Sequence, residues 1–207
     1  MRFCWLLLLA PALLPAADCA ALKSHAWNTG GLTLHSAQTI ATTPNVPEHC
    51  DVRGVFFPEA RFAVKLPTEW NGRFQMVGGG GYAGVLSTPA MDAALRAGYA
   101  TASTDTGHDA AKEPVATFGY PGPNNPHAAQ KVIHYAYLAV HQTAVLAKQI
   151  IAAHYGRAAR YSYWVGCSTG GRQGLIEAQR YPEDFDGYVI GAPVSDFTNV
   201  NLRGIWN

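Results

Sequence analysis

The chain has 207 residues, of which 48% are hydrophobic and 14% are charged, and its formal net charge at neutral pH is +1. This composition excludes an intrinsically disordered chain, which combines low hydrophobicity with high net charge. The near-zero net charge also gives no electrostatic basis for binding nucleic acid. The length is sufficient for one domain with a hydrophobic core.

The first residues predict a secretory signal peptide. Arg2 is followed by an apolar run from residue 3 to residue 14, and small residues follow at Ala16, Ala17 and Ala20. Because the run is too short to span a bilayer comfortably, we expect cleavage within roughly residues 16 to 20, with a retained membrane anchor as the alternative. We assign residues 1–20 to the signal and 21–207 to a secreted or periplasmic protein that leaves the membrane after cleavage.

Downstream of the signal, strand-like and helix-like segments alternate. Residues 21–50 are polar and irregular, with breakers at Pro44 and Pro47. Short apolar or alternating runs predict strands within 52–66 and at 74–77, 99–104, 161–165 and 187–190; helical patterns cover 89–97, 127–155 and 171–181, and 114–126 is a loop. This alternation predicts right-handed βαβ units, and therefore an α/β fold with a mainly parallel sheet in a single domain.

The strongest local motif is G-x-S-x-G at Gly166, Ser168 and Gly170. A predicted strand precedes it and a predicted helix follows it, which is the context of a nucleophile elbow in α/β-hydrolases. The glycines let the strand and the helix approach a sharp turn closely, and the helix amino terminus favours developing negative charge. We therefore predict that Ser168 is a catalytic nucleophile. The alternative is an ordinary glycine-rich loop between a strand and a helix.

An oxyanion hole needs two N–H donors. The backbone of Thr169, the residue after the nucleophile, is expected to supply one. The other is expected from Gly79, Gly80 or Gly81, because four glycines at 78–81 follow a predicted strand and leave their N–H groups unobstructed. A flexible loop is one alternative. A phosphate-binding loop is another, but no G-K-[ST] follows and Val85 stands where a G-x-G-x-x-G motif needs its last glycine.

The partners of a serine nucleophile are harder to find. In this fold the acid and then the histidine follow the serine, yet every histidine of the chain precedes Ser168. Asp196 could be an acid, but without a later histidine to orient, it is expected to be a surface or turn residue. His108, just beyond the strand at 99–104, is the best upstream base, but the chain order favours a site-lining or structural role. His134 and His141 lie one heptad apart on a helix, and no metal-binding cluster is visible.

Longer motifs resemble the tannase and feruloyl esterase family of the α/β-hydrolase superfamily. They are GCSTGGRQG (166–174), AQRYP (178–182), DFDG (184–187) and GAP (191–193), preceded by WNGRF (70–74), GGGG (78–81) and ASTDTGH (102–108). The resemblance covers roughly residues 50 to 195 in order. It implies a hydrolase of esters of aromatic acids such as ferulate or gallate. Another serine hydrolase, such as a lipase, and a non-catalytic secreted binding protein on the same scaffold are the alternatives.

The resemblance also implies features outside this sequence. Family members are much longer, so the chain is expected to be the amino-terminal part, without the last strands, the triad acid and histidine, and a lid domain that often binds calcium. No cofactor is expected in the chain itself, and the isolated chain is expected to have little or no esterase activity. Cys167 is expected to pair with a cysteine beside the absent histidine, with an unpaired core cysteine as the alternative. Cys19 and Cys50 are expected to form a second disulfide.

Overall fold

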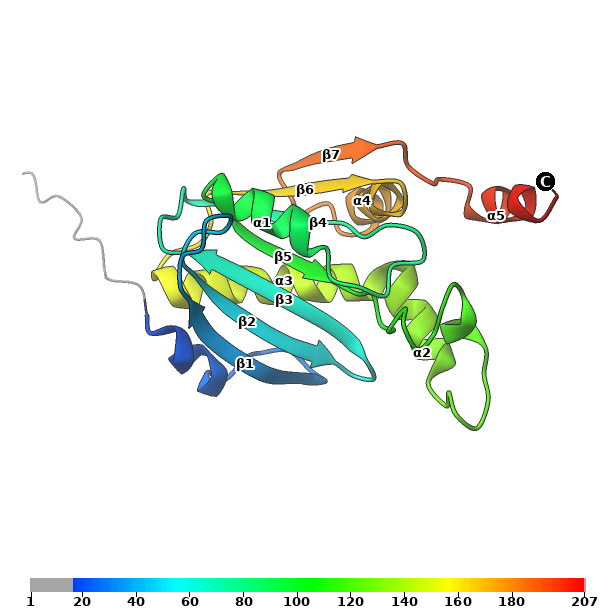
Figure 1. Cartoon of the computed structure of the whole chain (residues 1–207), viewed down its shortest axis with the longest axis horizontal. Coiled ribbons are helices and arrows are strands. Elements are labelled where there is room, and N and C mark those ends of the chain that lie inside the picture. Colours follow the sequence, from blue (N-terminus) through cyan, green and yellow to red (C-terminus); the bar gives the residue numbers. More distant parts are fainter. Residues whose placement is uncertain (1–16, 207) are drawn as a thin grey trace, which may run out of the picture.

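The computed structural model describes residues 17–206, so most of the predicted signal peptide lies outside the described residues. The described part contains a seven-stranded sheet in the order β1-β2-β3-β5-β4-β6-β7 (Figure 1). The strands are β1 (Leu32–Ile40), β2 (His49–Phe56), β3 (Ala60–Pro67), β4 (Arg73–Val77), β5 (Ala100–Thr104), β6 (Tyr161–Cys167) and β7 (Gly187–Gly191).

Strand direction confirms the predicted α/β fold and adds detail. The neighbours β1, β2, β3 and β5 pair antiparallel, whereas β5, β4, β6 and β7 pair parallel. Consequently β2 and the four strands β4 to β7 all point the same way. The carboxyl ends of β4 to β7 meet at one edge of the sheet, which is where open α/β sheets place their functional groups. The glycines at 78–81, His108 and Ser168 each follow one of these strands.

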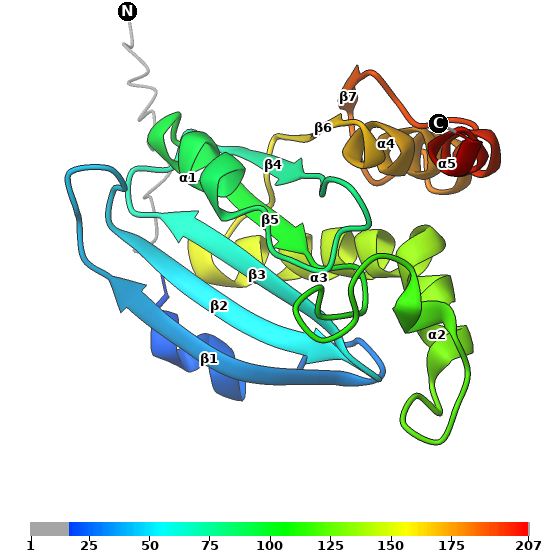
Figure 2. The same cartoon turned by 45° about the vertical axis from the view of Figure 1, so that its right-hand side comes forward.

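Helices cover both faces of the sheet (Figure 2). α1 (Thr88–Arg96) packs on β3, β4 and β5, while α3 (Ala139–Tyr155) contacts β3 and β5 from the opposite face. α4 (Thr169–Arg180) packs on β6 and β7 and contacts α3. The main core lies between the sheet and α3, and its fully buried side chains include Phe74, Met76, Leu146, Ile150, Ile151 and Trp164. Each such side chain contributes about 1.5–3 kcal/mol on removal from water.

The amino-terminal region is more regular than predicted. Residues 21–50 were expected to be irregular, but they include most of the 3-10 helix Cys19–Ser24 and the nine-residue strand β1. β1 lies at the edge of the sheet, and none of its residues is fully buried. Its apolar signal is therefore weak, and hydrogen bonding to β2 defines the strand instead.

A disulfide fixes this region to the sheet. Cys19 and Cys50 are bonded, with their Cα atoms 5.6 Å apart, and both are buried. The backbone N–H of Ala17 also donates to the carbonyl oxygen of His154 over 2.7 Å, so the chain is packed against α3 from its first described residue. Cleavage of the signal ahead of Cys19 keeps this disulfide, whereas cleavage after residue 20 would remove it.

The long helix predicted at 127–155 is interrupted. α2 (Ala128–Ile133) leads into a π-helical turn at His134–Leu138, and α3 continues from there. A π turn inserts extra backbone into the helix, and it changes the faces that His134 and His141 present. A last helix, α5 (Phe197–Trp206), was not predicted. Within residues 17–206, none of the helices is both long and apolar enough to span a bilayer.

Candidate active site

Ser168 occupies a sharp turn between β6 and α4. Its backbone has φ 58° and ψ −119°, a region that is costly for a residue with a side chain, and its side chain is exposed. The backbone around it is anchored on both sides: the Ser168 N–H donates to Gly191 in β7 over 3.0 Å, and the Ser168 carbonyl accepts from Arg172 over 3.0 Å. A strained, exposed serine at a helix amino terminus is the geometry of a nucleophile elbow.

The glycines around Ser168 leave no room for side chains. A Cβ on Gly166 would collide with the carbonyl group of Gly170. A Cβ on Gly170 would lie 2.9 Å from the carbonyl oxygen of Gly79, and one on Gly78 would lie 2.6 Å from the Cα of Gly170. The G-x-S-x-G spacing therefore allows β6, α4 and the segment after β4 to meet at backbone contact.

We call Gly78–Gly81 the glycine loop, and its four residues differ in their partners. The Gly79 N–H is buried and donates to Oε1 of Gln173 over 3.1 Å. This bond uses the Gly79 N–H, which disfavours Gly79 among the three predicted donor positions. Gly80 and Gly81 are exposed, and a Cβ on either would meet open space. They remain the predicted donors from this loop.

Thr169, the other predicted donor, begins α4. As the first helical residue it has a backbone N–H without an intrahelical partner. Its side chain is buried, and the hydroxyl donates to the carbonyl oxygen of Gly81. The residue after the nucleophile is thus linked directly to the glycine loop.

His108 lies in an aromatic stack. Its ring packs on Phe118 with 4.1 Å between centroids and meets Tyr135 edge-on at 6.2 Å. The side chain is buried, neither ring nitrogen has a hydrogen-bond partner among residues 17–206, and burial lowers the pKa of the imidazole. The ring makes no hydrogen bond to Ser168 among the described residues, which favours the structural role over that of the base.

Asp196 and His134, which were expected to be surface, turn or core residues, have the following surroundings. The carboxylate of Asp196 is exposed and caps α5 by accepting from the backbone N–H of Asn199 over 3.1 Å. His134 is buried, and a Cβ on Gly107 would lie 2.8 Å from the Cβ of His134. In the described part of the chain, no histidine is hydrogen-bonded to the Ser168 hydroxyl.

One cluster of ionisable side chains was not visible in the sequence. Nδ1 of His141 lies 2.7 Å from the Asp184 carboxylate, and one ligand atom of Glu177 lies within 4.8 Å of these atoms. Glu177 is fully buried, and burial followed by the charge of the nearby Asp184 raises its pKa to about 8. Lys148 lies 3.8 Å from Asp184. His141 precedes Glu177 by 36 residues, so no short motif in the sequence shows the cluster.

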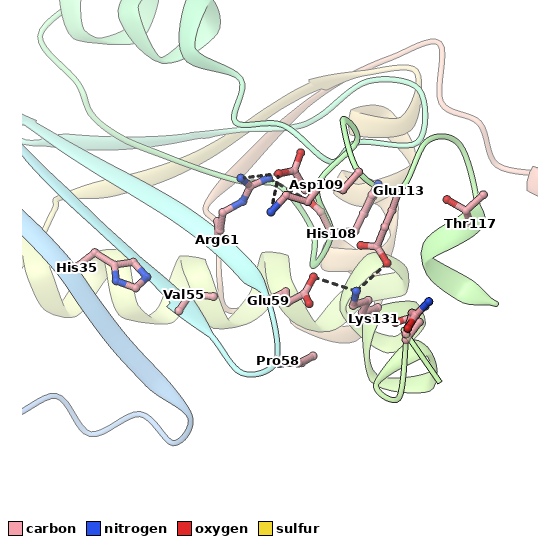
Figure 3. A pocket seen from close by; sticks show the side chains of 13 residues that line it. His35, Val55, Pro58, Glu59, Arg61, His108, Asp109, Glu113, Thr117 and Lys131 are labelled. Atoms are coloured by element: carbon pink, nitrogen blue, oxygen red, sulfur yellow. Dashed lines mark hydrogen bonds and ion pairs between the residues drawn. The ribbon is translucent and has the colours of Figure 1, made fainter. Parts of the chain in front are cut away.

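Two hollows lie near this edge of the sheet. A polar cavity of about 710 Å³ is lined by Arg61, His108 and Lys131, and Lys131 is held between Glu59 at 2.9 Å and Glu113 at 2.7 Å (Figure 3). None of its lining residues belongs to the elbow or the glycine loop. A second hollow of about 520 Å³, lined mainly by glycine, alanine and valine, includes the glycine loop up to Gly80 and also Cys167.

Cys167 has an exposed thiol. Among residues 17–206 it is the cysteine that is not in a disulfide. In the described part of the chain the thiol lies at the surface beside the nucleophile, which favours the expected disulfide over an unpaired core cysteine.

The sequence is similar to a known protein family. The sequence profile described as "Tannase and feruloyl esterase" matches residues 44–207. A mono(2-hydroxyethyl) terephthalate hydrolase from Piscinibacter sakaiensis is 35% identical over 196 residues, which are 83% of this chain and 31% of that protein. A probable feruloyl esterase from Arthroderma benhamiae is 42% identical over 138 residues, which are 63% of this chain and 24% of that protein.

Solved structures agree with the sequence matches. An esterase from Aspergillus oryzae superposes with a TM-score of 0.73 at 26% identity, covering 84% of this chain and 37% of that one. Feruloyl esterase B from the same organism gives a TM-score of 0.69 at 29% identity, with 84% and 36% covered. The chain therefore spans about a quarter to a third of the length of the curated relatives above and a little over a third of these structures.

Proposed function

Because the chain belongs to the tannase and feruloyl esterase family, we propose that it carries the nucleophile of a serine esterase that cleaves esters of aromatic acids. The observation that carries this proposal is the backbone of Ser168, which is exposed and held at φ 58° where α4 begins. Thr169, the residue after this serine, is hydrogen-bonded to the glycine loop, in which Gly80 and Gly81 are exposed. Backbone strain of this kind clusters at active sites.

The reaction is a two-step acyl transfer. A base removes the Ser168 hydroxyl proton while Oγ attacks the ester carbonyl, and the carbonyl oxygen becomes negatively charged. The backbone N–H groups of Thr169 and of Gly80 or Gly81 donate to this oxygen, and the amino terminus of α4 stabilises its charge. The alcohol leaves with the proton from the base, and water then releases the aromatic acid and regenerates the serine.

We assign the base and its orienting acid to a part of the whole protein beyond this sequence. The described residues support this assignment, because His108 is buried in an aromatic stack and the Asp196 carboxylate accepts a hydrogen bond from the backbone of α5. The 207-residue chain on its own is then expected to turn over esters thousands of times more slowly than the whole protein. Cys167 is suited to a disulfide with the segment that carries the base, because its thiol is exposed beside Ser168.

Calcium, if the whole protein holds it, belongs to the lid domain rather than to this chain. Calcium prefers six to eight oxygen ligands. The cluster around Glu177 does not fit that preference, because His141 contributes a nitrogen and the Lys148 ammonium lies close to Asp184. No step of the proposed reaction uses a cofactor in this chain.

The substrate class follows from what the relatives' names share. Ferulate and terephthalate are both aromatic acids, so their esters place a carbonyl group beside an unsaturated or aromatic carbon. The buried disulfide between Cys19 and Cys50 supports a secreted or periplasmic location, since such bonds persist in oxidising compartments.

The test is hydrolysis by the whole protein that contains this chain. Release of ferulate from methyl ferulate, absent in Ser168→Ala, is the expected result. Cleavage of tributyrin without methyl ferulate would favour a lipase. A folded whole protein that hydrolyses neither ester and reacts with no fluorophosphonate would favour a non-catalytic binding protein.

A further inference from the structure

The glycine loop needs contacts from other segments of the chain to hold a single conformation. Its four glycines have no side chains to pack, and glycine loses more backbone freedom on folding than any other residue. An oxyanion hole stabilises charge only when its donors are fixed before the reaction begins. The proposed function therefore requires contacts that hold this loop beside Ser168.

The first residue of the loop is bonded to β6 and to the residue before α1, and the later part of the loop is closed by a turn. The Gly78 N–H donates to the Val165 carbonyl in β6 over 2.9 Å, and the Gly78 carbonyl accepts from the hydroxyl of Ser87, the residue before α1, over 2.8 Å. Beyond the loop, the Ala83 N–H donates to the Gly80 carbonyl over 2.8 Å. These contacts fix where the loop begins and where it turns back.

The middle of the loop is held by two side chains of α4. Gln173 accepts from the Gly79 N–H through Oε1 at 3.1 Å, and Thr169 donates from Oγ1 to the Gly81 carbonyl. These residues are four apart on the helix, so they lie on one face, and both are buried. One contact holds the 78–79 peptide unit through its N–H, and the other holds the 81–82 unit through its C=O. Together they flank the two peptide units that carry the N–H groups of Gly80 and Gly81.

We propose that Thr169 and Gln173 are positioning residues that hold the glycine loop so that the N–H groups of Gly80 and Gly81 face the reacting carbonyl oxygen. The inference rests on the proposed function. It gives the Thr169 side chain a task separate from that of its backbone N–H, which every substitution at this position except proline would retain. It also explains why Gly79 is bonded away from the site while Gly80 and Gly81 stay open.

Isosteric variants of the whole protein test this role. Thr169→Val removes the hydroxyl, Thr169→Ser keeps it, and Gln173→Met removes the acceptor with little change in volume. We expect Thr169→Val and Gln173→Met to lower kcat for methyl ferulate by about 10- to 100-fold with KM changed less than about 3-fold, because misplacing a donor acts mainly on the transition state. Thr169→Ser is expected to keep kcat within about 3-fold of the wild type.

A second readout separates positioning from general loss of structure. Phenylboronic acid forms a tetrahedral adduct with an active serine and places an oxygen in the oxyanion hole, so its inhibition constant should rise in step with the fall in kcat. Should either buried variant fail to fold, the other gives the same readout. Wild-type kcat in a folded Thr169→Val or Gln173→Met, together with an inactive Ser168→Ala, would overturn the positioning role alone. An active Ser168→Ala would overturn the proposed function itself.

Discussion

The indole nitrogen of Trp164 donates a hydrogen bond to the carbonyl oxygen of Gly170 over 3.0 Å, in a fully buried position. Trp164 lies in β6, four residues before Ser168, and Gly170 lies in the first turn of α4, two residues after it. The bond therefore ties together the two elements that hold the strained serine. Trp164 also stacks edge-on against Phe185 at 5.7 Å, which anchors the same ring in the main core.

The contact between Trp164 and α4 predicts an unusual effect for Gly174→Ala. Alanine in place of glycine inside a helix ordinarily stabilises by about 1 kcal/mol. Here a Cβ on Gly174 would lie 2.5 Å from Nε1 of Trp164, so we expect destabilisation by about 1–3 kcal/mol from overpacking. Urea unfolding of the chain measures it. Gly122→Ala, at an exposed position with no atom within 4 Å, is the matched control and should change stability by less than about 0.5 kcal/mol.

The raised pKa of Glu177 leads us to predict that the stability of the fold depends on pH. Its pKa is raised from 4.5 to about 8, so between these values the folded state holds a proton that the unfolded state has lost. Stability should then fall as pH rises through this window, by about 1 kcal/mol per pH unit. Unfolding at pH 6.5 and pH 8 should show the fall in the wild type and a flatter response in Glu177→Gln. The exposed Glu183→Gln is the control, and equal slopes in all three proteins would contradict the assignment to Glu177.

The disulfide predicts a large loss of stability on removal. Cys19 and Cys50 are 31 residues apart, and closing a loop of that length restricts the unfolded chain by about 3–4 kcal/mol. The double variant Cys19→Ala, Cys50→Ala should lose roughly this amount in denaturant unfolding under oxidising conditions. Cys167→Ala in the same chain removes an exposed thiol and should be nearly neutral. A double variant as stable as the wild type would show that the bond does not constrain the fold.

Substitution of His108 tests whether the catalytic base is His108 or a residue outside this sequence. Both ring nitrogens lack hydrogen-bond partners within the described residues, so an apolar side chain of similar volume should fit the aromatic stack. In the whole protein, His108→Leu is therefore expected to keep kcat for methyl ferulate within about 3-fold, whereas loss of a catalytic base costs several orders of magnitude. A thousand-fold loss in a folded His108→Leu would make His108 the base and remove the need for one outside this sequence.

The sequence predicted the parts of the fold whose signals are local. The strand and helix around Ser168 combine a short apolar run, a glycine spacing and a helical period within twenty residues, and the structure places β6 and α4 there within a few residues of the predicted bounds. β1 escaped prediction because an edge strand needs no buried side chains. The π turn at His134–Leu138 escaped because it depends on packing rather than on any residue pattern.

Contacts between distant segments were beyond the reach of sequence patterns. Gln173 is 94 residues from Gly79, and only the folded backbone shows that the amide oxygen of one accepts from the N–H of the other. The same holds for Glu177 and His141, which are 36 residues apart in sequence and meet only because α3 packs beside α4. The sequence predicted which glycine loop faces the nucleophile, but the choice of donors within it needed the hydrogen bonds.

The most direct test of the central claim is the rate at which the whole protein hydrolyses methyl ferulate with and without the Ser168 hydroxyl. Ser24→Ala, which removes an exposed hydroxyl in the amino-terminal 3-10 helix, is the matched control. We predict that Ser168→Ala loses at least about a thousand-fold in kcat/KM while its fold is unchanged, and that Ser24→Ala stays at the wild-type rate. A folded Ser168→Ala that retains the wild-type rate would contradict the assignment of Ser168 as the nucleophile.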